Sequence, residues 1–97
     1  MENSIDPDKI FAATEALKAI ANERRLHILC ALLEGKKNVT ELQEITGVNQ
    51  SNISQHLAKM RALGVLTYER DGKQVYYSLA HPAYKKIIMA LKEIFCP

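Results

Sequence analysis

Long apolar runs are missing from this chain of 97 residues. The runs that it has are far shorter than the roughly 20 apolar residues that a helix needs to cross a bilayer, so we expect no membrane-spanning segment and no membrane partner. The N-terminal stretch MENSIDPDK is polar and acidic, and it lacks the basic start and apolar core of a secretory signal. We therefore expect a cytoplasmic protein whose residues 1–5 are disordered.

Cysteine is scarce, with Cys30 and Cys96 as the two examples. Because the cytoplasm keeps thiols reduced, these residues are poor candidates for a permanent disulfide. They are either inert core residues or a switch. Cys30 lies on an apolar helix face, where free cysteine commonly packs as a small hydrophobe. Cys96 differs, because a residue next to the end of a chain is seldom part of a core.

Catalytic motifs are absent as well. The sequence has no nucleophile elbow, phosphate-binding loop or paired carboxylates, and a chain of this length has little room for a substrate cleft. We expect one domain over residues 1–97, without enzymatic activity and without a cofactor. Its 47% hydrophobic content exceeds what a small monomer easily buries, so we expect the surplus to be covered in a homodimer.

Two short helices joined by a tight turn are predicted for residues 39–63. Asn38 and Glu41 have the spacing of a capping box that opens the first helix, and Gly47 ends it. Asn49 is placed to cap the second helix. Two helices with so short a turn match a helix-turn-helix unit, whose second helix enters the DNA groove.

The second of these helices divides into a buried face and an exposed face. Apolar residues recur at helical spacing at Ile53, Leu57 and Met60. The opposite face is small and polar, and no acidic residue occurs between Glu44 and Glu69 to repel phosphate. This pattern favours a DNA contact over a face that is merely solvated. The candidate DNA-binding residues of this helix are Asn49, Gln50, Ser51, Asn52, Ser54, Gln55, Lys59 and Arg61.

These candidates differ in what they can recognise. Gln55 and Ser54 are the candidates for base edges, since glutamine can pair bidentately with adenine. Residues at the margin of the face, such as Asn52 and Arg61, are better placed for backbone phosphates, which position a protein without specifying sequence. His56 projects close to the buried stripe, which favours semi-buried packing over a DNA contact.

A β-hairpin follows, because the apolar period changes from that of a helix to that of a strand at Val65. Asp71-Gly72 is a strong hairpin signal, and the strands around it predict a two-stranded wing over residues 65–79. A ribbon this small must pack against the helices to be stable. The wing tip carries further candidate DNA contacts at Arg70, Lys73 and Gln74.

Three further helices complete the prediction. One opens at Asp6-Pro7, and the next is capped by Asn22, ended by Gly35 and apolar on more than one side, so it is central. A last helix from Pro82 has a broad apolar stripe with too few partners in one small domain. We assign the first and last helices to a homodimer interface. Its candidate residues are Ile10, Leu17, Ile87, Ile88, Leu91 and Ile94.

Three stretches carry a family resemblance. LKAIANERRLHILCALLEG, ITGVNQSNISQHLAKMRALGVL and ERDGKQVYYSL, in this order, resemble the ArsR/SmtB family of bacterial winged-helix repressors. The resemblance covers the chain from Leu17 onward. It implies a mainly α winged helix-turn-helix, with five helices and a two-stranded antiparallel wing, that binds an inverted repeat of double-stranded DNA as a homodimer.

Within the family, the chain looks most like the BigR/HlyU-like thiol-sensing branch. That branch has one cysteine in a context like ILCALLEG and another in a context like EIFCP, which Cys30 and Cys96 match. The resemblance implies a repressor that binds DNA when reduced. Reactive sulfur species or an oxidant would link the thiols by a disulfide or polysulfide bridge, and DNA would be released. Arg24, Arg25 and His27 are the candidates for favouring the reactive thiolate.

The metal-sensing branches of the family differ from this chain at their ligand positions. Asn38-Val39-Thr40 stands where one site has a Cys-Val-Cys run. At the other site His81 is alone and Ile94 occupies a later ligand position, so both family sites are missing. One alternative stays open, a metal- or metalloid-sensing repressor that uses the soft ligands His27, Cys30 and Cys96.

Overall fold

The computed structural model describes residues 6–96, which form five α-helices, one 3₁₀ turn and a two-stranded hairpin. In chain order the elements are α1 (Pro7–Ile20), α2 (Glu23–Ala31), the 3₁₀ turn η1 (Leu32–Glu34), α3 (Val39–Thr46), α4 (Gln50–Ala62), β1 (Leu66–Asp71), β2 (Gln74–Leu79) and α5 (Pro82–Phe95). This order confirms the predicted winged helix-turn-helix. The predicted disorder of residues 1–5 lies outside the described residues.

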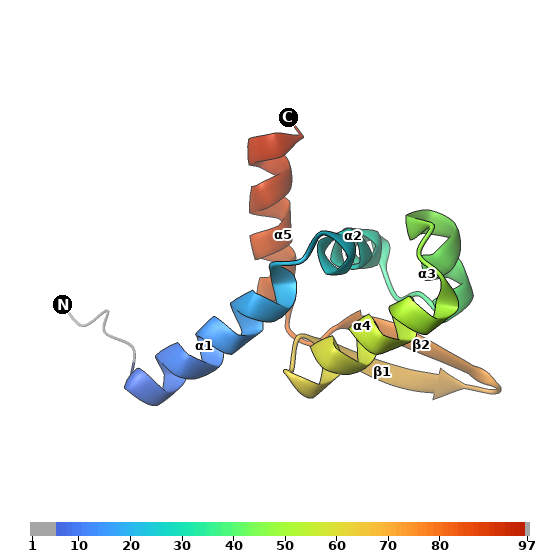
Figure 1. The fold of residues 1–97 in the computed structure, drawn as a ribbon, viewed down its shortest axis with the longest axis horizontal. Helices are drawn as coiled ribbons and strands as arrows, with labels where there is room; N and C mark the ends of the chain where they lie inside the picture. The colour runs from blue at the N-terminus through green and yellow to red at the C-terminus, as the bar shows by residue number, and fades with distance from the viewer. Residues whose placement is uncertain (1–5, 97) are drawn as a thin grey trace.

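The molecule has a body and two arms (Figure 1). The body, residues 22–80, contains α2, α3, α4 and the hairpin. The arms are α1 and α5, which extend from the body in different directions. α1 packs on α2 and α4, while α5 packs on β2. Within residues 6–96, no helix combines the length and the apolar content needed to cross a membrane.

Side-chain caps fix where the helices of the body begin. Asn22 caps α2 by accepting two backbone N–H groups. Asn38 and Glu41 form the predicted capping box at α3, with donor-to-acceptor distances of 2.8 and 2.9 Å. At α4, the Asn49 side-chain oxygen accepts the N–H of Asn52 at 2.9 Å. Because each cap satisfies donors that a helix leaves open, these three starts are specified locally.

The ends of two helices differ from the prediction. α2 stops at Ala31 rather than running to Gly35, because the chain tightens into the 3₁₀ turn η1 where it meets the core. Leu32 in this turn is 3% exposed, and Gly35, with a φ of 135°, ends it. At the start of α1, Asp6 occupies the cap position without a side-chain hydrogen bond.

The wing is an antiparallel hairpin with a two-residue turn. Asp71 pairs with Gln74, so Gly72 and Lys73 form the turn and Asp71 is the last residue of β1. Gly72 has a φ of 66° and no non-glycine residue among 6–96 has a positive φ, which matches a type II′ turn. The predicted hairpin is therefore confirmed, with its turn one residue later than Asp71-Gly72.

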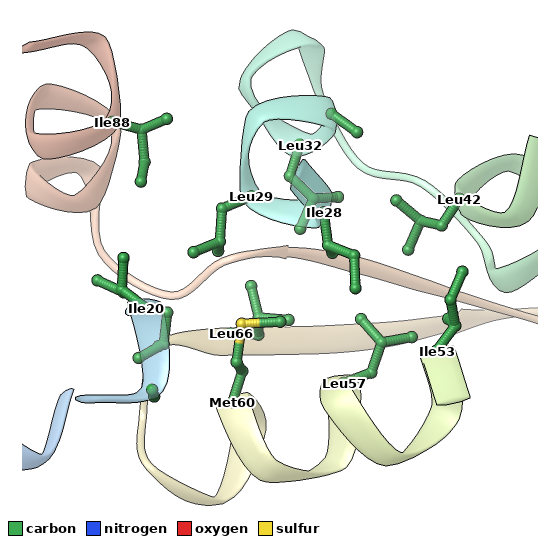
Figure 2. Close-up of a cluster of buried hydrophobic side chains, with 13 residues drawn as sticks. Ile20, Ile28, Leu29, Leu32, Leu42, Ile53, Leu57, Met60, Leu66 and Ile88 are labelled. Carbon is green, nitrogen blue, oxygen red and sulfur yellow. The ribbon is translucent and has the colours of Figure 1, made fainter. Parts of the chain in front are cut away.

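The core lies where α2, α3, α4 and the start of β1 meet (Figure 2). Ile53, Leu57 and Met60 point from α4 toward Ile28 and Leu29 of α2, and all five side chains have 0% exposure. The predicted apolar stripe of Ile53, Leu57 and Met60 is thus confirmed as the face that fixes α4 to the body. Burial of side chains of this size contributes roughly 1.5 to 3 kcal/mol each.

The arms expose much of their apolar surface. Leu17 is 55% exposed on α1, while Ile94 and Phe95 are 67% and 76% exposed on α5. Ile10 and Ile87 are also exposed, and Leu91 is half-buried. Ile88 differs from the prediction, because it has 0% exposure within one chain and belongs to the core rather than to a subunit interface.

Candidate nucleic-acid interface and thiol pair

The exposed side of α4 is polar and carries no acidic residue. Because the opposite side of the helix is fixed in the core, this side faces away from the body. The predicted division of α4 into two faces is confirmed, while the DNA contact itself stays a prediction. The exposed residues of this face are Gln50, Ser51, Ser54, Gln55, Ala58 and Lys59, of which Ala58 alone is not polar.

The start of α4 combines capping with a half-buried edge. Asn49 uses its side-chain oxygen on the N–H of Asn52, so one predicted DNA contact also has a structural task. Asn52 and His56 are half-buried, as predicted for His56, and they lie on one side of α4. Burial lowers the pKa of His56, and the positive charges of Arg25 and Arg24 on α2 lower it further.

The end of α4 is connected to the wing by a cation–π contact. The guanidinium carbon of Arg61 lies 4.2 Å from the centre of the Tyr68 ring on β1. Tyr68 in turn lies 6.2 Å from the ring of Tyr77 on β2, with the ring planes at 34°. Arg61 is exposed, so its charge is held in place and remains open to a phosphate.

The loop before α3 anchors the wing. Lys36 Nζ lies 3.1 Å from Glu69 Oε1 and 5.1 Å from the centre of the Tyr76 ring. The hydrogen bond to Glu69 and its charge raise the pKa of Lys36. Lys37 forms an isolated antiparallel bridge with Tyr77, in which each backbone N–H donates to the carbonyl oxygen of the other residue at nitrogen-to-oxygen distances of 3.1 and 2.8 Å. The wing therefore has a fixed position relative to the helix-turn-helix.

The wing tip contains Gln74, which is hydrogen-bonded to the α3 cap, and two exposed cations. Gln74 Oε1 accepts a hydrogen bond from Asn38 Nδ2 at 3.3 Å, so Gln74 connects the wing to the cap of α3. Arg70 and Lys73 are exposed. The carboxylate of Glu69, which would oppose a DNA contact on this strand, is paired with Lys36. The pairing neutralises one of the two carboxylates of β1, while Asp71 beside the turn is exposed.

The thiols lie on different elements that approach each other. Cys30 is half-buried on α2, Cys96 is exposed directly after α5, and both are free thiols. Burial raises the pKa of the Cys30 thiol, the positive charge of Lys92 lowers it, and the charge of Cys96 raises it. Lys92 on α5 and Cys96 directly after it are thus close enough to Cys30 for their charges to shift its pKa.

The cation that acts on Cys30 is Lys92, and not one of the predicted candidates Arg24, Arg25 and His27. Arg25 instead donates a hydrogen bond from Nη1 to the carbonyl oxygen of Ala19 at 3.0 Å. Arg24 and Arg25 act on His56, and Lys92 on α5 is the cation that acts on Cys30. Its signal in the sequence is its position four residues before Cys96, which places both on one side of the helix end.

The alternative metal site does not assemble in the part of the chain that the structure describes. Among residues 6–96, no group of three or more His, Cys, Asp or Glu side chains is placed to hold a metal ion. His27 lines a pocket between α2 and α4, together with His56. His27, Cys30 and Cys96 therefore do not form one site among residues 6–96.

Comparisons with known proteins agree with this architecture. The chain is 41% identical to the HTH-type transcriptional regulator YgaV of Escherichia coli over 87 residues, which cover 88% of this chain and 87% of YgaV. The family model described as "Bacterial regulatory protein, arsR family" matches residues 22–68, from the cap of α2 into β1. The chain belongs to the ArsR family.

Other ArsR-family similarities extend to solved structures. The transcriptional activator HlyU of Vibrio cholerae is 40% identical over 84 residues, covering 87% of this chain and 78% of HlyU. A structure of reduced HlyU has a TM-score of 0.85 at 38% identity and covers 93% of this chain and 95% of that one. The homodimeric winged helix-turn-helix DNA-binding domain of Mb0332 from Mycobacterium bovis has a TM-score of 0.82 at 26% identity, covering 97% and 89%.

The membership fixes the class of activity. This ArsR-family protein is a DNA-binding transcriptional regulator and not an enzyme. Sequence reasoning identified the groove helix, the wing and the thiols, but it missed Lys92 and the anchoring role of Lys36. Lys36 gives no local signal, because its partner Glu69 lies 33 residues away in the chain.

Proposed function

We propose that this regulator is a homodimeric repressor whose DNA binding ends when Cys30 and Cys96 become covalently linked. One observation carries the proposal: the charges of Lys92 and Cys96, at the end of α5, both act on the Cys30 thiol. Cys30 on α2 and Cys96 directly after α5 are both free thiols, and the charge of Cys96 is close enough to act on Cys30. The relative HlyU is described in a reduced form, which supports a redox interpretation.

In the DNA-bound form, the exposed face of α4 lies in the major groove. Gln55 and Ser54 meet base edges, while Lys59, Arg70 and Lys73 meet the backbone. A dimer presents two such helices about 34 to 36 Å apart, one turn of DNA, to the two halves of an inverted repeat. The fixed angle between wing and α4 supports this mode, because both must reach the DNA together.

The linking step is a two-electron oxidation of the thiols. Cys96 is exposed, so its sulfur takes the sulfane sulfur of a persulfide donor RSSH first, which gives a Cys96 persulfide and RSH. The Cys30 thiolate then attacks the Cys96 sulfur, forms the disulfide and releases hydrosulfide. The sulfane sulfur is reduced, and the two cysteine thiols are oxidised. A disulfide-forming oxidant such as diamide gives the same bond without hydrosulfide.

The bond acts on DNA binding through α5. Linking its end to α2 restrains an arm whose exposed apolar face is proposed to meet the second copy of the chain. A changed angle between α5 and the body alters the spacing of the two α4 helices. A typical coupling of about 1 to 3 kcal/mol weakens DNA binding by roughly 5- to 150-fold.

The test is a single binding series on a duplex that the reduced protein selects from random sequences. Affinity is measured for reduced, diamide-oxidised, persulfide-treated and zinc-loaded protein, with the Cys30→Ser and Cys96→Ser variants alongside. We expect a loss of roughly 5- to 150-fold after either oxidation, and no loss in either variant. Release that persists in Cys30→Ser contradicts the proposal. Equimolar zinc that stays bound and disappears in Cys96→Ser would favour metal sensing instead.

Lys92 allows a second test of the thiol pair. Its charge lowers the pKa of Cys30, so Lys92→Gln leaves less thiolate at neutral pH and slows formation of the bond. Glu93→Gln on the same turn is the matched control and should leave the rate unchanged. The rate is followed by mass spectrometry after addition of diamide. Equal rates for Lys92→Gln and the wild type would show that Lys92 does not activate Cys30.

A third test addresses the groove helix. Gln55→Ala should reduce the preference for the selected duplex over a scrambled one by about 1 to 3 kcal/mol, because a bidentate base contact is lost. Gln43→Ala, on the preceding helix, removes the same side chain as a control. Unchanged preference in Gln55→Ala would move the base contacts to another residue.

A further inference from the structure

An open pocket of about 700 Å³ lies between α2 and α4. Its sides come from the start of α2, the turn between α3 and α4, and the half-buried side of α4. Arg24 and His27 line it from α2, and Asn52 and His56 line it from α4. Side chains that can donate hydrogen bonds to an anion thus converge from two helices on one space.

The charged groups of the lining are one arginine, Arg24, and one carboxylate, Glu23, beside His27 and His56, while Arg25 lies outside the lining. The guanidinium charges of Arg24 and Arg25 both act on His56. Among residues 6–96 two ion pairs form, one within α1 and one between the wing and the loop before α3. Neither pair includes an arginine, so the guanidinium of Arg24 is open to an added anion.

The side chains, and not the helix ends, are the groups that can hold this anion. The Asn22 side chain accepts the N–H groups of Arg24 and Arg25, and the Asn49 side chain accepts that of Asn52. These amides already have partners. An anion in the pocket would therefore be bound by the guanidinium of Arg24 and the imidazole of His27.

We propose that the pocket binds one phosphate of the DNA backbone beside the groove that α4 occupies. The inference rests on the proposed placement of α4 in the groove. Asn49 and Asn52 line the pocket and also belong to the start of α4, so a strand that borders the groove passes the pocket opening. No acidic residue occurs between Glu44 and Glu69, and Glu23 is the one carboxylate of the lining that would oppose the phosphate. A contact of this kind positions the protein and is independent of base sequence.

The test uses the salt dependence of DNA binding by the reduced, full-length protein. Log affinity falls with log salt, and each phosphate contact adds about 0.9 to the magnitude of that slope. Losing the contact in both copies of a dimer therefore reduces the magnitude of the slope by about 1.8. The test variant combines Arg24→Gln with His27→Gln. We expect its slope to fall by this amount on the selected duplex and on a scrambled duplex alike, with its circular dichroism spectrum and melting temperature unchanged.

Lys9→Gln is the matched control, because it removes the same charge from the start of α1, at the far end of that arm from the body (Figure 1). Its slope should equal that of the wild type. An unchanged slope in the double variant, or an equal fall in Lys9→Gln, overturns the proposal.

Two further measurements distinguish a free phosphate from a DNA phosphate, and this inference from the proposed function. Inorganic phosphate is titrated into the DNA-free protein while the imidazole signals of His27 and His56 are followed by NMR. Saturation at millimolar phosphate together with an unchanged DNA slope would assign the pocket to a free anion and overturn the backbone contact. Gln55→Ala should lose sequence preference and keep the wild-type slope. If the wild type binds no duplex, both this inference and the proposed function are wrong. If the wild type prefers the selected duplex and the double variant keeps the wild-type slope, this inference alone is wrong.

Discussion

The body and the arms of this molecule differ in how far they bury their apolar side chains. In the body, α2, α3 and α4 each begin at a side-chain cap, and α4 buries its apolar stripe completely. In the arms, apolar side chains such as Leu17, Ile94 and Phe95 stay more than half exposed. The body is therefore complete within one chain, whereas the arms need another surface. The proposed control by the thiol at the end of α5 would thus act on the less constrained part.

The largest effect that tests this contrast is expected in the body. Leu57→Ala removes a fully buried side chain from α4 and should lower the free energy of unfolding by about 2 to 5 kcal/mol. The loss should be the same at low and high protein concentration, because the contacts of Leu57 lie within one chain. Urea unfolding at two concentrations measures it. A loss below about 0.5 kcal/mol would show that the body is not the rigid part.

The next effect concerns the arms. Ile94→Ser removes an apolar side chain that is 67% exposed in one chain and should be covered in a dimer. Burial of such a side chain contributes about 1.5 to 3 kcal/mol, so the dimer dissociation constant should rise at least about tenfold. Sedimentation velocity measures it, with Glu93→Ala on the neighbouring position as the control. Equal dissociation constants for Ile94→Ser and the wild type would remove α5 from the interface.

The body was the more predictable part because its signals are local. A capping box needs residues three apart, and a hairpin needs a turn between two strand-forming segments, so Asn38, Glu41 and Gly72 could be interpreted within a short window. The stripe of α4 was predicted for the same reason. The exception is the end of α2, where the core at Leu32 tightens the last turn into a 3₁₀ geometry that no local pattern specified.

The arms and the site were less predictable because tertiary contacts decide them. Ile87 and Ile88 belong to one apolar stripe in the sequence, yet Ile87 is 40% exposed and Ile88 is fully buried in the core. Which of them faces the body depends on the angle of α5, and periodicity carries no information on that angle. Lys92 and Cys30 show the same limit, since 62 residues separate a cation from the thiol on which it acts.

Helix capping gives a further test of the difference between the body and the arms, with a smaller expected change in the free energy of unfolding. Asn49 accepts the N–H of Asn52 at the start of α4, so Asn49→Ala should lower the free energy of unfolding by about 0.5 to 2 kcal/mol. Asp6 holds the equivalent position on α1 without a side-chain hydrogen bond, so Asp6→Ala should have almost no effect. Thermal unfolding of both variants measures the difference. Equal losses would mean that the arm is anchored as firmly as the body.

The smallest effect is the pH dependence of stability that His56 gives to the body. Burial and the charges of Arg25 and Arg24 hold the pKa of His56 in the folded chain below its ordinary value of 6.5. As pH falls through 6.5, the unfolded chain takes up this proton more readily than the folded chain, so stability falls. His56→Gln removes this contribution, and its melting temperature should drop less between about pH 7.5 and about pH 5.5.

Arg24→Gln locates the source of that pH dependence. It keeps the burial of His56 and removes one of the two repelling charges, so its pH dependence should lie between those of the wild type and His56→Gln. His81 caps α5 through its Nδ1, which accepts the N–H of Ala83, and His81→Asn preserves a capping side chain as a control on the arm. If His81→Asn flattens the pH profile more than His56→Gln does, the pH sensitivity belongs to the arm. If His56→Gln has the larger effect, it belongs to the pocket between α2 and α4, where a bound phosphate would oppose the same repulsion.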